Sequence, residues 1–251
     1  MDKLHDLAVS NYGTVRGRRY DMALLPWGAT EPHNLHLPYL TDCILSHDIA
    51  ADAALLAHER YGVECMVLPA VNLGSQNPGQ RELPFCIHAR YETQKAVLTD
   101  IVASLAVQEV DKLLIVNGHG GNGFKNMIRD LAVDYPDFMI AASEWYTVLP
   151  AGEWFDNPGD HADELETSVM MHYHPELVDL AEAGRGAGKP FASQMLREKA
   201  AWIPRNWQCV TADTGIGDPS SATAAKGERF AKAVVEKYAQ LLYELTRQPI
   251  Y

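Results

Sequence analysis

The sequence predicts an α/β fold of three layers, α/β/α, with a mainly parallel central sheet between two layers of helices. Short apolar runs of strand length alternate along the chain with longer segments of helical character. That order is typical of strand–helix–strand units, whose right-handed crossovers cover both faces of a parallel sheet. The 251 residues, 47% of them hydrophobic, provide enough apolar material for one large core. We therefore expect a single domain that spans residues 1–251.

Apolar runs rich in branched residues mark the strands, and the longer segments between them mark the helices. The predicted strands are Met22–Pro26, Cys65–Ala70, Lys112–Asn117 and Phe138–Ala142. The predicted helices are Cys43–Arg60, Thr93–Gln108, Gly123–Val133, Glu164–His174 and Ala222–Arg247, with Thr41 or Asp42 as the cap of the first. In such sheets functional residues gather in the loops beyond the carboxyl ends of the strands.

The composition excludes several classes of protein. A formal net charge of −12 repels polyanions, so we expect no nucleic-acid partner. No segment approaches the roughly 18 apolar residues that a membrane-spanning helix needs. The N-terminal Met-Asp-Lys-Leu-His-Asp does not resemble a secretory signal, and the four cysteines form no CxxC motif. We expect a soluble cytoplasmic protein with reduced cysteines and no membrane partner.

The loop after the first predicted strand concentrates possible metal ligands. Glu31, His33, His36 and Asp42 fall within twelve residues of one another. In an extended loop, residues two apart project to the same side, so Glu31 and His33 can face one point. Mixed carboxylate and imidazole ligands suit zinc, manganese or iron. A polar surface loop would explain one or two of these residues, but four in so short a segment favour a metal site.

The loop after the third predicted strand allows two interpretations. Its glycines let the backbone turn tightly and present His119 where the loop enters a helix. Gly118, Gly120 and Gly123 also form a GxGxxG pattern, with Glu144 about twenty residues on, as in a dinucleotide-binding fold. The pattern follows the third strand instead of the first, however, and a dinucleotide site leaves the Glu31–Asp42 cluster without a role. A metal site uses both segments.

A third segment, His161-Ala-Asp-Glu-Leu-Glu166-Thr-Ser, places two acidic residues near a predicted helix start. Acidic side chains are common there because they interact favourably with the helix dipole. Taken alone, this segment is therefore weak evidence for a site.

Together the three segments resemble the creatininase family. Members of that family have an E-x-H-G-x-H-L-P-x-x-T-D string after a strand, then N-G-H-G-G-N, then H-A-G-x-x-E-T-S. The corresponding segments here are Glu31-Pro-His33-Asn-Leu-His36-Leu-Pro-Tyr-Leu-Thr-Asp42, Asn117-Gly-His119-Gly-Gly-Asn122 and His161–Ser168, and Gly215-Ile-Gly-Asp-Pro is similar to a fourth family string. The resemblance runs from about Met22 to the C-terminal helix, and it departs from the family pattern at Pro32 and Asn34.

The resemblance implies a role for each of these residues. Glu31 and His119 would bind one metal ion, His33 and Glu166 would bind a second, and Asp42 would bridge the two. His161 would act beside the metals as a proton donor. His36 would support a ligand by a hydrogen bond, and Trp145 and Trp154 would stack on a flat substrate.

The function implied is hydrolysis of a carbon–nitrogen bond in a small cyclic or compact amide. Two divalent cations, zinc first and manganese or iron as alternatives, would lower the pKa of a water between them and polarise the carbonyl. The resemblance also implies a homo-oligomer, often a hexamer. Relatives that act on creatinine have a glutamate where this chain has Gly121, so we expect poor hydrolysis of creatinine.

Two other functions stay open from the sequence. One is a nicotinamide-dependent oxidoreductase that uses the Gly118–Gly123 turn. The other is a non-catalytic small-molecule binding protein that keeps the fold; loss of a ligand would favour it, and all five ligands are present.

Overall fold

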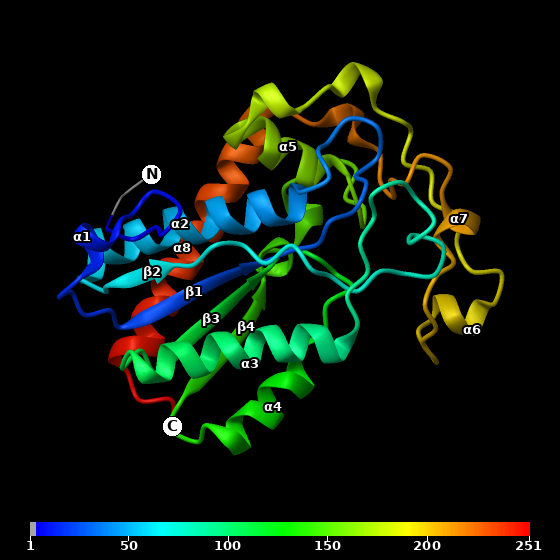
Figure 1. Ribbon diagram of the computed structural model, residues 1–251. Coiled ribbons are helices and arrows are strands. Elements are labelled where there is room, and N and C mark those ends of the chain that lie inside the picture. The colour runs from blue at the N-terminus through cyan, green and yellow to red at the C-terminus, as the bar shows by residue number, and fades with distance from the viewer. Residues whose placement is uncertain (1–3) are drawn as a thin grey trace.

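The chain folds around a four-stranded parallel sheet in the order β2-β1-β3-β4 (Figure 1). The structure is a computed structural model that describes residues 4–251. The strands are β1 (Met22–Trp27), β2 (Cys65–Val67), β3 (Lys112–Asn117) and β4 (Met139–Glu144). The predicted α/β fold with its mainly parallel sheet is confirmed.

β2 is shorter than the predicted Cys65–Ala70. Pro69 has no backbone N–H and so cannot continue a strand ladder. The chain nevertheless stays beside β1, because Leu68 N donates to Leu24 O and Val71 N donates to Pro26 O. The segment after β2 therefore reaches the carboxyl end of β1 as an ordered extension of the sheet.

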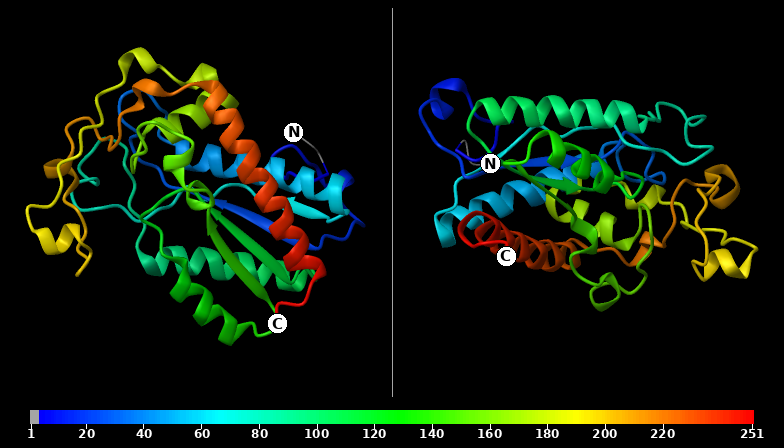
Figure 2. Two further views of the ribbon diagram at one scale, coloured as in Figure 1. Left: turned by 180° about the vertical axis from the view of Figure 1, so that it is seen from behind. Right: turned by 90° about the horizontal axis from the view of Figure 1, so that it is seen from below.

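Helices cover both faces of the sheet (Figure 2). One face packs against α2 (Thr41–Tyr61), α5 (Glu164–Tyr173) and α8 (Ala224–Arg247), and the other against α3 (Tyr91–Val107) and α4 (Phe124–Asp134). Alternate side chains of the strands divide between the two cores. Leu24, Leu114 and Val116 join the α2 and α8 side, whereas Leu25, Leu113 and Ile115 join the α3 and α4 side. The result is the predicted three-layer architecture.

The start of α2 differs from the prediction in a way that matters for function. Thr41 and Asp42 are the first two residues of the helix, and Leu40 precedes it without a side-chain cap. The hydroxyl of Thr41 donates to Pro38 O. Asp42 directs its carboxylate to two histidines instead of to the backbone of its own helix. The predicted cap residue is therefore part of a side-chain cluster.

Two glycines allow α2 to begin at the carboxyl ends of β1 and β3. A Cβ on Gly28 would lie 2.5 Å from Asp42 Cβ, and one on Gly118 would lie 2.5 Å from Asp42 O and closer still to Ser46 Oγ. Real Cβ atoms do not approach other heavy atoms so closely, so any larger residue would displace the helix. These close contacts bring Asp42 to the ends of both central strands.

Apart from α5, the helices between β4 and α8 are short. They are the 3₁₀ turns η1 (Trp145–Thr147), η2 (Ala151–Glu153), η3 (Pro175–Leu177), η4 (Leu180–Glu182) and η5 (Pro219–Ser221), and the four-residue helices α6 (Gln194–Arg197) and α7 (Trp207–Val210). Figure 1 shows α6 and α7 standing off from the main body, on the side to which the strands point. A further short helix, α1 (Tyr12–Val15), lies near the opposite end.

Two expectations concern membranes and secretion. Within residues 4–251 no helix is long and apolar enough to cross a membrane. The expectation about a secretory signal rests partly on residues 1–3, which lie outside the described chain.

Candidate metal centre

A cluster of buried acidic and histidine side chains lies at the carboxyl ends of β1 and β3. The loop after β1 contributes Glu31 and His33, the first turn of α2 contributes Asp42, and the loop after β3 contributes His119. Each of these four side chains belongs to a residue less than 7% exposed. Glu166, in the first turn of α5, completes the set. The structure thus brings together all five residues that the sequence singles out as metal ligands.

Two of the three possible ligand groups at this site share Asp42; the third joins Glu31, His33 and His161. Glu31, Asp42 and His119 form one group and His33, Asp42 and Glu166 form the other, with the possible ligand atoms of each group within 4.8 Å of one another. The two oxygens of Asp42 divide between the groups: Oδ1 lies 2.8 Å from His33 Nε2, and Oδ2 lies 3.3 Å from His119 Nδ1. A carboxylate oriented in this way can bridge two cations.

Backbone carbonyls fix the orientation of both histidines. His33 Nδ1 lies 3.0 Å from Glu31 O, and His119 Nε2 lies 2.7 Å from Ser75 O. Because a carbonyl can only accept a hydrogen bond, each of these nitrogens carries the proton. Once each imidazole has lost its second proton, the lone pairs therefore lie on His33 Nε2 and His119 Nδ1, the two nitrogens that face Asp42. This arrangement is the usual support for a metal-binding histidine.

Glu31 is held by a residue that the sequence analysis missed. Its Oε1 lies 2.8 Å from His119 Nδ1, while its Oε2 accepts a hydrogen bond of 2.6 Å from Gln80 Nε2. Gln80 is 1% exposed, and its own side-chain oxygen accepts from Asn77 N at 2.6 Å. A glutamine in a polar loop gives no sequence signal, because only the fold brings it beside Glu31.

Glu166 is positioned by the start of α5. Its Oε2 accepts a hydrogen bond of 2.5 Å from Ala162 N, which leaves Oε1 for the cluster. Asp163 caps the helix by accepting from Glu166 N at 3.0 Å, and its second oxygen accepts from Gly159 N. Asp163 is thus a capping residue, whereas Glu166 is directed at His33 and Asp42.

Charge is balanced within the cluster by the pairing of acids and histidines. Burial lowers the pKa of His33, but the Asp42 carboxylate outweighs burial and raises that pKa to about 10. Burial likewise opposes protonation of His119, yet Glu31 and Asp42 hold its pKa well above the usual value. Burial raises the pKa of Glu166 to about 8. Asp42 keeps a lowered pKa in spite of burial, because His33 and His119 lie beside it.

The donor set fits divalent transition metals. Carboxylates and imidazoles in a mixed set suit zinc, manganese and iron. Asp42 Oδ2 is buried and accepts no hydrogen bond from any described residue. A buried carboxylate oxygen without a donor is rare in proteins and is expected where a cation completes its surroundings. The residues present are therefore compatible with a two-metal site.

His161 lies beside this cluster, on the side of the cavity. Its Nε2 donates to Pro32 O at 3.0 Å, which leaves Nδ1 directed at Glu31 Oε1, 3.7 Å away. The ring centroids of His161 and His33 are 4.2 Å apart, and Trp207 contacts the other side of His161 edge-on at 5.4 Å. Burial lowers the pKa of His161, and the neighbouring His33 lowers it further.

Two residues predicted to contact the substrate lie elsewhere. Trp145 is 1% exposed and packs edge-on against Phe230, and Trp154 packs against the same phenylalanine. Trp145 belongs to the core between the sheet and α8, Trp154 is partly buried against that core, and neither lines the cavity beside the cluster. The aromatic residue that does reach His161 is Trp207, which follows a long irregular segment and shows no distinctive sequence pattern.

His36 lies one layer behind His33. Its Nε2 is 2.8 Å from the hydroxyl of Thr167, the residue that follows Glu166. Burial lowers the pKa of His36 to about 4. The side chain therefore links the loop after β1 to α5, in keeping with a supporting position.

The glycine-rich turn after β3 is closed on itself. Asn117 Nδ2 donates to His119 O, and Asn122 Nδ2 donates both to Asn117 Oδ1 and to Gly28 O. Asn122 Oδ1 also accepts from Ser75 N. With Gly118 packed against α2, the turn fixes His119 in place, and His119 pairs with Glu31 and Asp42 of the cluster. This geometry argues against the dinucleotide interpretation.

Two of the departures from the family pattern, at Asn34 and Gly121, have structural explanations. Asn34 has φ of +55°, a left-handed conformation that asparagine adopts far more readily than most residues. Its amide also pairs with Gly184 through two hydrogen bonds. At Gly121, a Cβ would overlap Ser75 O and lie 2.5 Å from His119 Nε2. A side chain at 121 would therefore break the Ser75–His119 hydrogen bond.

A large open cavity of about 1530 Å³ leads away from the cluster. Glu31, His119 and His161 lie at its inner end, and the segment that contains α6 and α7 forms much of its outer wall. Four basic side chains line that wall: Lys189, Arg197, Lys199 and Arg205. Arg205 pairs with Asp160 and lies over the Trp207 ring.

Comparison with known proteins places this geometry in a family. The creatininase family model, described as creatinine amidohydrolase, matches residues 7–242. The chain belongs to the creatininase family. A Bacteroides fragilis protein, named as a candidate creatinine amidohydrolase, has a solved structure that is 62% identical; it superposes with a TM-score of 0.98 over 100% of both chains.

Other creatininase-family proteins are more distant. The mycofactocin precursor peptide peptidase of Mycolicibacterium smegmatis is 32% identical, over 90% of this chain and 87% of that protein. Two creatininase structures described as Zn-Zn and Mn forms share the fold at 22% identity, with TM-scores of 0.70 and 0.73. They cover 90% and 96% of this chain, and 91% and 98% of their own.

Proposed function

We propose that this creatininase-family protein is a metal-dependent hydrolase that cleaves a carbon–nitrogen bond in a small cyclic or compact amide. Glu31 and His119 hold one divalent ion, His33 and Glu166 hold the other, and Asp42 is shared. Zinc is the first choice, and manganese or iron suits the same donors. The observation that carries the proposal is the division of the two Asp42 oxygens between His33 and His119.

When bound, two such ions lower the pKa of water and polarise a carbonyl oxygen. The chain supplies proton transfer through His161. Because Pro32 O fixes the proton on Nε2, Nδ1 is the atom that exchanges protons with the cavity. The lowered pKa of His161 leaves Nδ1 free to accept a proton from water and to pass it to the leaving nitrogen. Trp207 limits the access of water to the outer side of that imidazole.

The test is a screen of small lactams and formamides with zinc- and manganese-loaded protein, followed by mass spectrometry of the products. Asp42→Ala protein prepared in the same way is the matched control. We expect turnover that requires metal and that the substitution abolishes. Hydrolysis that survives both chelation and the Asp42 substitution would refute a metal mechanism.

Creatinine is proposed to be a poor substrate. At Gly121 the chain lacks the carboxylate of the creatinine-active relatives, and no Cβ fits there without displacing Ser75 or His119. Installing a glutamate at this position would therefore disturb the metal ligand itself, so the unaltered protein gives the cleaner test. Efficient creatinine hydrolysis by zinc- or manganese-loaded protein would refute this part of the proposal.

A peptide is the second candidate substrate, and the size of the cavity favours it. About 1530 Å³ exceeds the roughly 300–1,000 Å³ of most small-molecule sites, and a relative of 32% identity is a peptidase. Lys189, Arg197 and Lys199 on the outer wall could bind a carboxylate of an extended chain. Matched peptides with a free or an amidated C-terminus would test this, since a carboxylate requirement predicts cleavage of the free form alone.

A further inference from the structure

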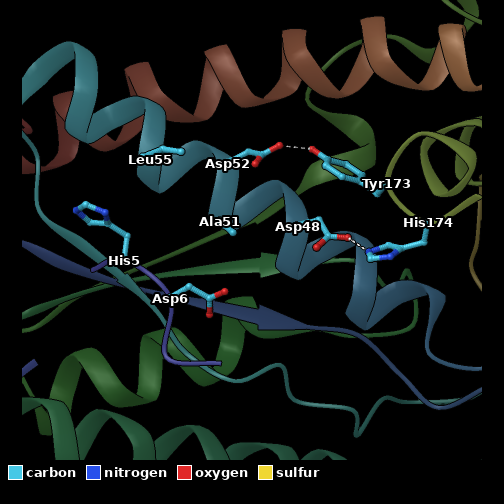
Figure 3. A pocket seen from close by; sticks show the side chains of 8 residues that line it. All are labelled: His5, Asp6, Asp48, Ala51, Asp52, Leu55, Tyr173 and His174. Atoms are coloured by element: carbon cyan, nitrogen blue, oxygen red, sulfur yellow. Dashed lines mark hydrogen bonds and ion pairs between the residues drawn. The ribbon is translucent and has the colours of Figure 1, made fainter. Parts of the chain in front are cut away.

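A second pocket, remote from the metal cluster, is formed by three segments of the chain (Figure 3). It has a volume of about 240 Å³ and is lined by His5, Asp6, Asp48, Ala51, Asp52, Leu55, Tyr173 and His174. Asp48, Ala51, Asp52 and Leu55 recur at the spacing of one face of α2. The N-terminal segment and the end of α5 supply the other walls, so the fold, and no single sequence motif, creates this pocket.

Asp6 is the most unusual residue of the pocket. It is 1% exposed, and its position is fixed because the backbone on either side pairs with Val67. Its Oδ1 accepts from Ala8 N at 2.9 Å and lies 3.2 Å from His47 Nε2. Its Oδ2 is buried and has no hydrogen-bond partner. A buried carboxylate oxygen without a donor in the protein indicates that a water, a cation or an N–H group from outside the chain completes its surroundings.

Asp48 and Asp52 each have one carboxylate oxygen, Oδ2, paired with a side chain of the pocket. Asp48 Oδ2 lies 2.7 Å from His174 Nε2, and Asp52 Oδ2 accepts a hydrogen bond of 2.8 Å from the Tyr173 hydroxyl. Figure 3 shows both pairs, with Asp6 on the separate N-terminal segment. Within residues 4–251 no lysine or arginine lines the pocket or pairs with these three acids. Among the described residues, the basic side chains that line the pocket or contact these acids are His5, His47 and His174.

We propose that this pocket binds a small organic cation with a guanidinium or primary ammonium group. The volume is far larger than the roughly 30 Å³ of one water, so a single ion would not fill it. Among the described residues, Asp6, Asp48 and Asp52 belong to no set of three possible metal-ligand atoms within 4.8 Å of one another; the pocket residue His5 forms such a set with His58 and Glu64, which do not line the pocket. An N–H-rich cation can donate to Asp6 Oδ2 and to a second carboxylate, while Ala51 and Leu55 contact its alkyl part.

The test uses metal-loaded protein in phosphate buffer, which contains no competing amine. Methylguanidinium and methylurea, its neutral counterpart of nearly the same shape, are titrated by calorimetry and by saturation-transfer NMR. We expect saturable binding of one methylguanidinium per chain, at least about tenfold tighter than methylurea. Equal binding of the two compounds, or binding of neither, would overturn the proposal.

Variants then locate the binding. Asp6→Asn keeps an oxygen for Ala8 N but removes the charge, and we expect it to weaken methylguanidinium binding at least about tenfold. Asp52→Asn, at an exposed position of α2, provides a second test if the Asp6 variant folds poorly. Asp100→Asn on α3 makes the same change in net charge elsewhere and should leave binding unchanged. Unaltered binding in both pocket variants, or Asp6-dependent uptake of a third divalent metal in place of the organic cation, would refute the assignment.

Discussion

At the scale of single residues, Asp42 is the central side chain of the cluster, because each of its carboxylate oxygens faces a different histidine. If Asp42 is shared, its loss should remove both metal ions, whereas loss of His33 should mainly weaken one. We therefore predict that Asp42→Ala protein contains almost no metal and that His33→Ala protein keeps the ion at Glu31 and His119. Metal content by mass spectrometry measures this directly, and two ions retained by the Asp42 variant would disprove the bridging role.

Gln80 is the residue whose role the structure adds. Its amide donates to Glu31 Oε2 and so directs the other oxygen to His119. We predict that Gln80→Leu lowers metal affinity about 10- to 100-fold, the usual effect of removing a partner of a metal ligand. Competition with a chelator of known affinity provides the measurement. Gln248→Leu, at the end of α8, is the matched control and should bind metal like the unaltered protein.

At the scale of elements, the approach of α2 to the sheet depends on glycines. Gly118 leaves no space for a Cβ between β3 and Asp42, whereas Gly123, five residues later, has nothing within 4 Å of a Cβ and a negative φ. We predict that Gly118→Ala lowers the free energy of unfolding by about 1–3 kcal/mol and reduces metal content, because it displaces Asp42. Gly123→Ala, at the N-cap of α4, should leave the metal content unchanged even if it costs some stability. Thermal unfolding together with metal analysis would test the pair, and a normal Gly118 variant would contradict the argument.

Most elements could be predicted from the sequence because their apolar periods are strong. The four strands and five main helices lie within a few residues of the predicted ranges. The errors arise where tertiary contacts override local preference. The sequence predicts Thr41 or Asp42 as the cap of α2, but both lie in its first turn, and the Asp42 carboxylate faces His33 and the sequence-distant His119. Pro69 shortened β2 although the apolar run continues past it.

At the scale of the whole molecule, the metal centre is linked to pH. In the metal-free protein the pKa values of His33, at about 10, and of His119 are raised by neighbouring carboxylates, and burial raises that of Glu166 to about 8. All three are therefore protonated at pH 7 and must lose their protons to bind metal. We predict that metal binding releases protons and strengthens as the pH rises from about 7 towards 10. Calorimetry in buffers of different ionisation enthalpy measures the release, and pH-independent affinity would contradict it.

The sequence motifs identified the five side chains of the cluster, but the residues that surround the cluster could be identified only from the folded structure. Trp145 is a core residue, Trp154 packs against the core, and neither lines the cavity, because a sequence motif does not determine the direction of an irregular segment. Stacking of these tryptophans on a substrate stays a prediction. Trp207 and Gln80 could not be found from the sequence, since they reach the site from loops with no distinctive pattern. Single-domain organisation, a hexameric assembly and a cytoplasmic location stay predictions.

Backbone carbonyls orient His33 and His119, and this limits which substitutions can disrupt the metal centre as the sequence evolves. Glu31 O and Ser75 O belong to the backbone, so no substitution of the side chain at either position deletes these two hydrogen bonds. Few positions are therefore expected to abolish the metal centre when mutated: the ligands themselves, Gln80, and the glycines that allow α2 to approach the sheet. The long wall formed by residues 188–210 carries none of these supports. Changes there can alter which molecule enters the cavity while the reactive end stays intact, which allows new specificities to evolve without first losing activity.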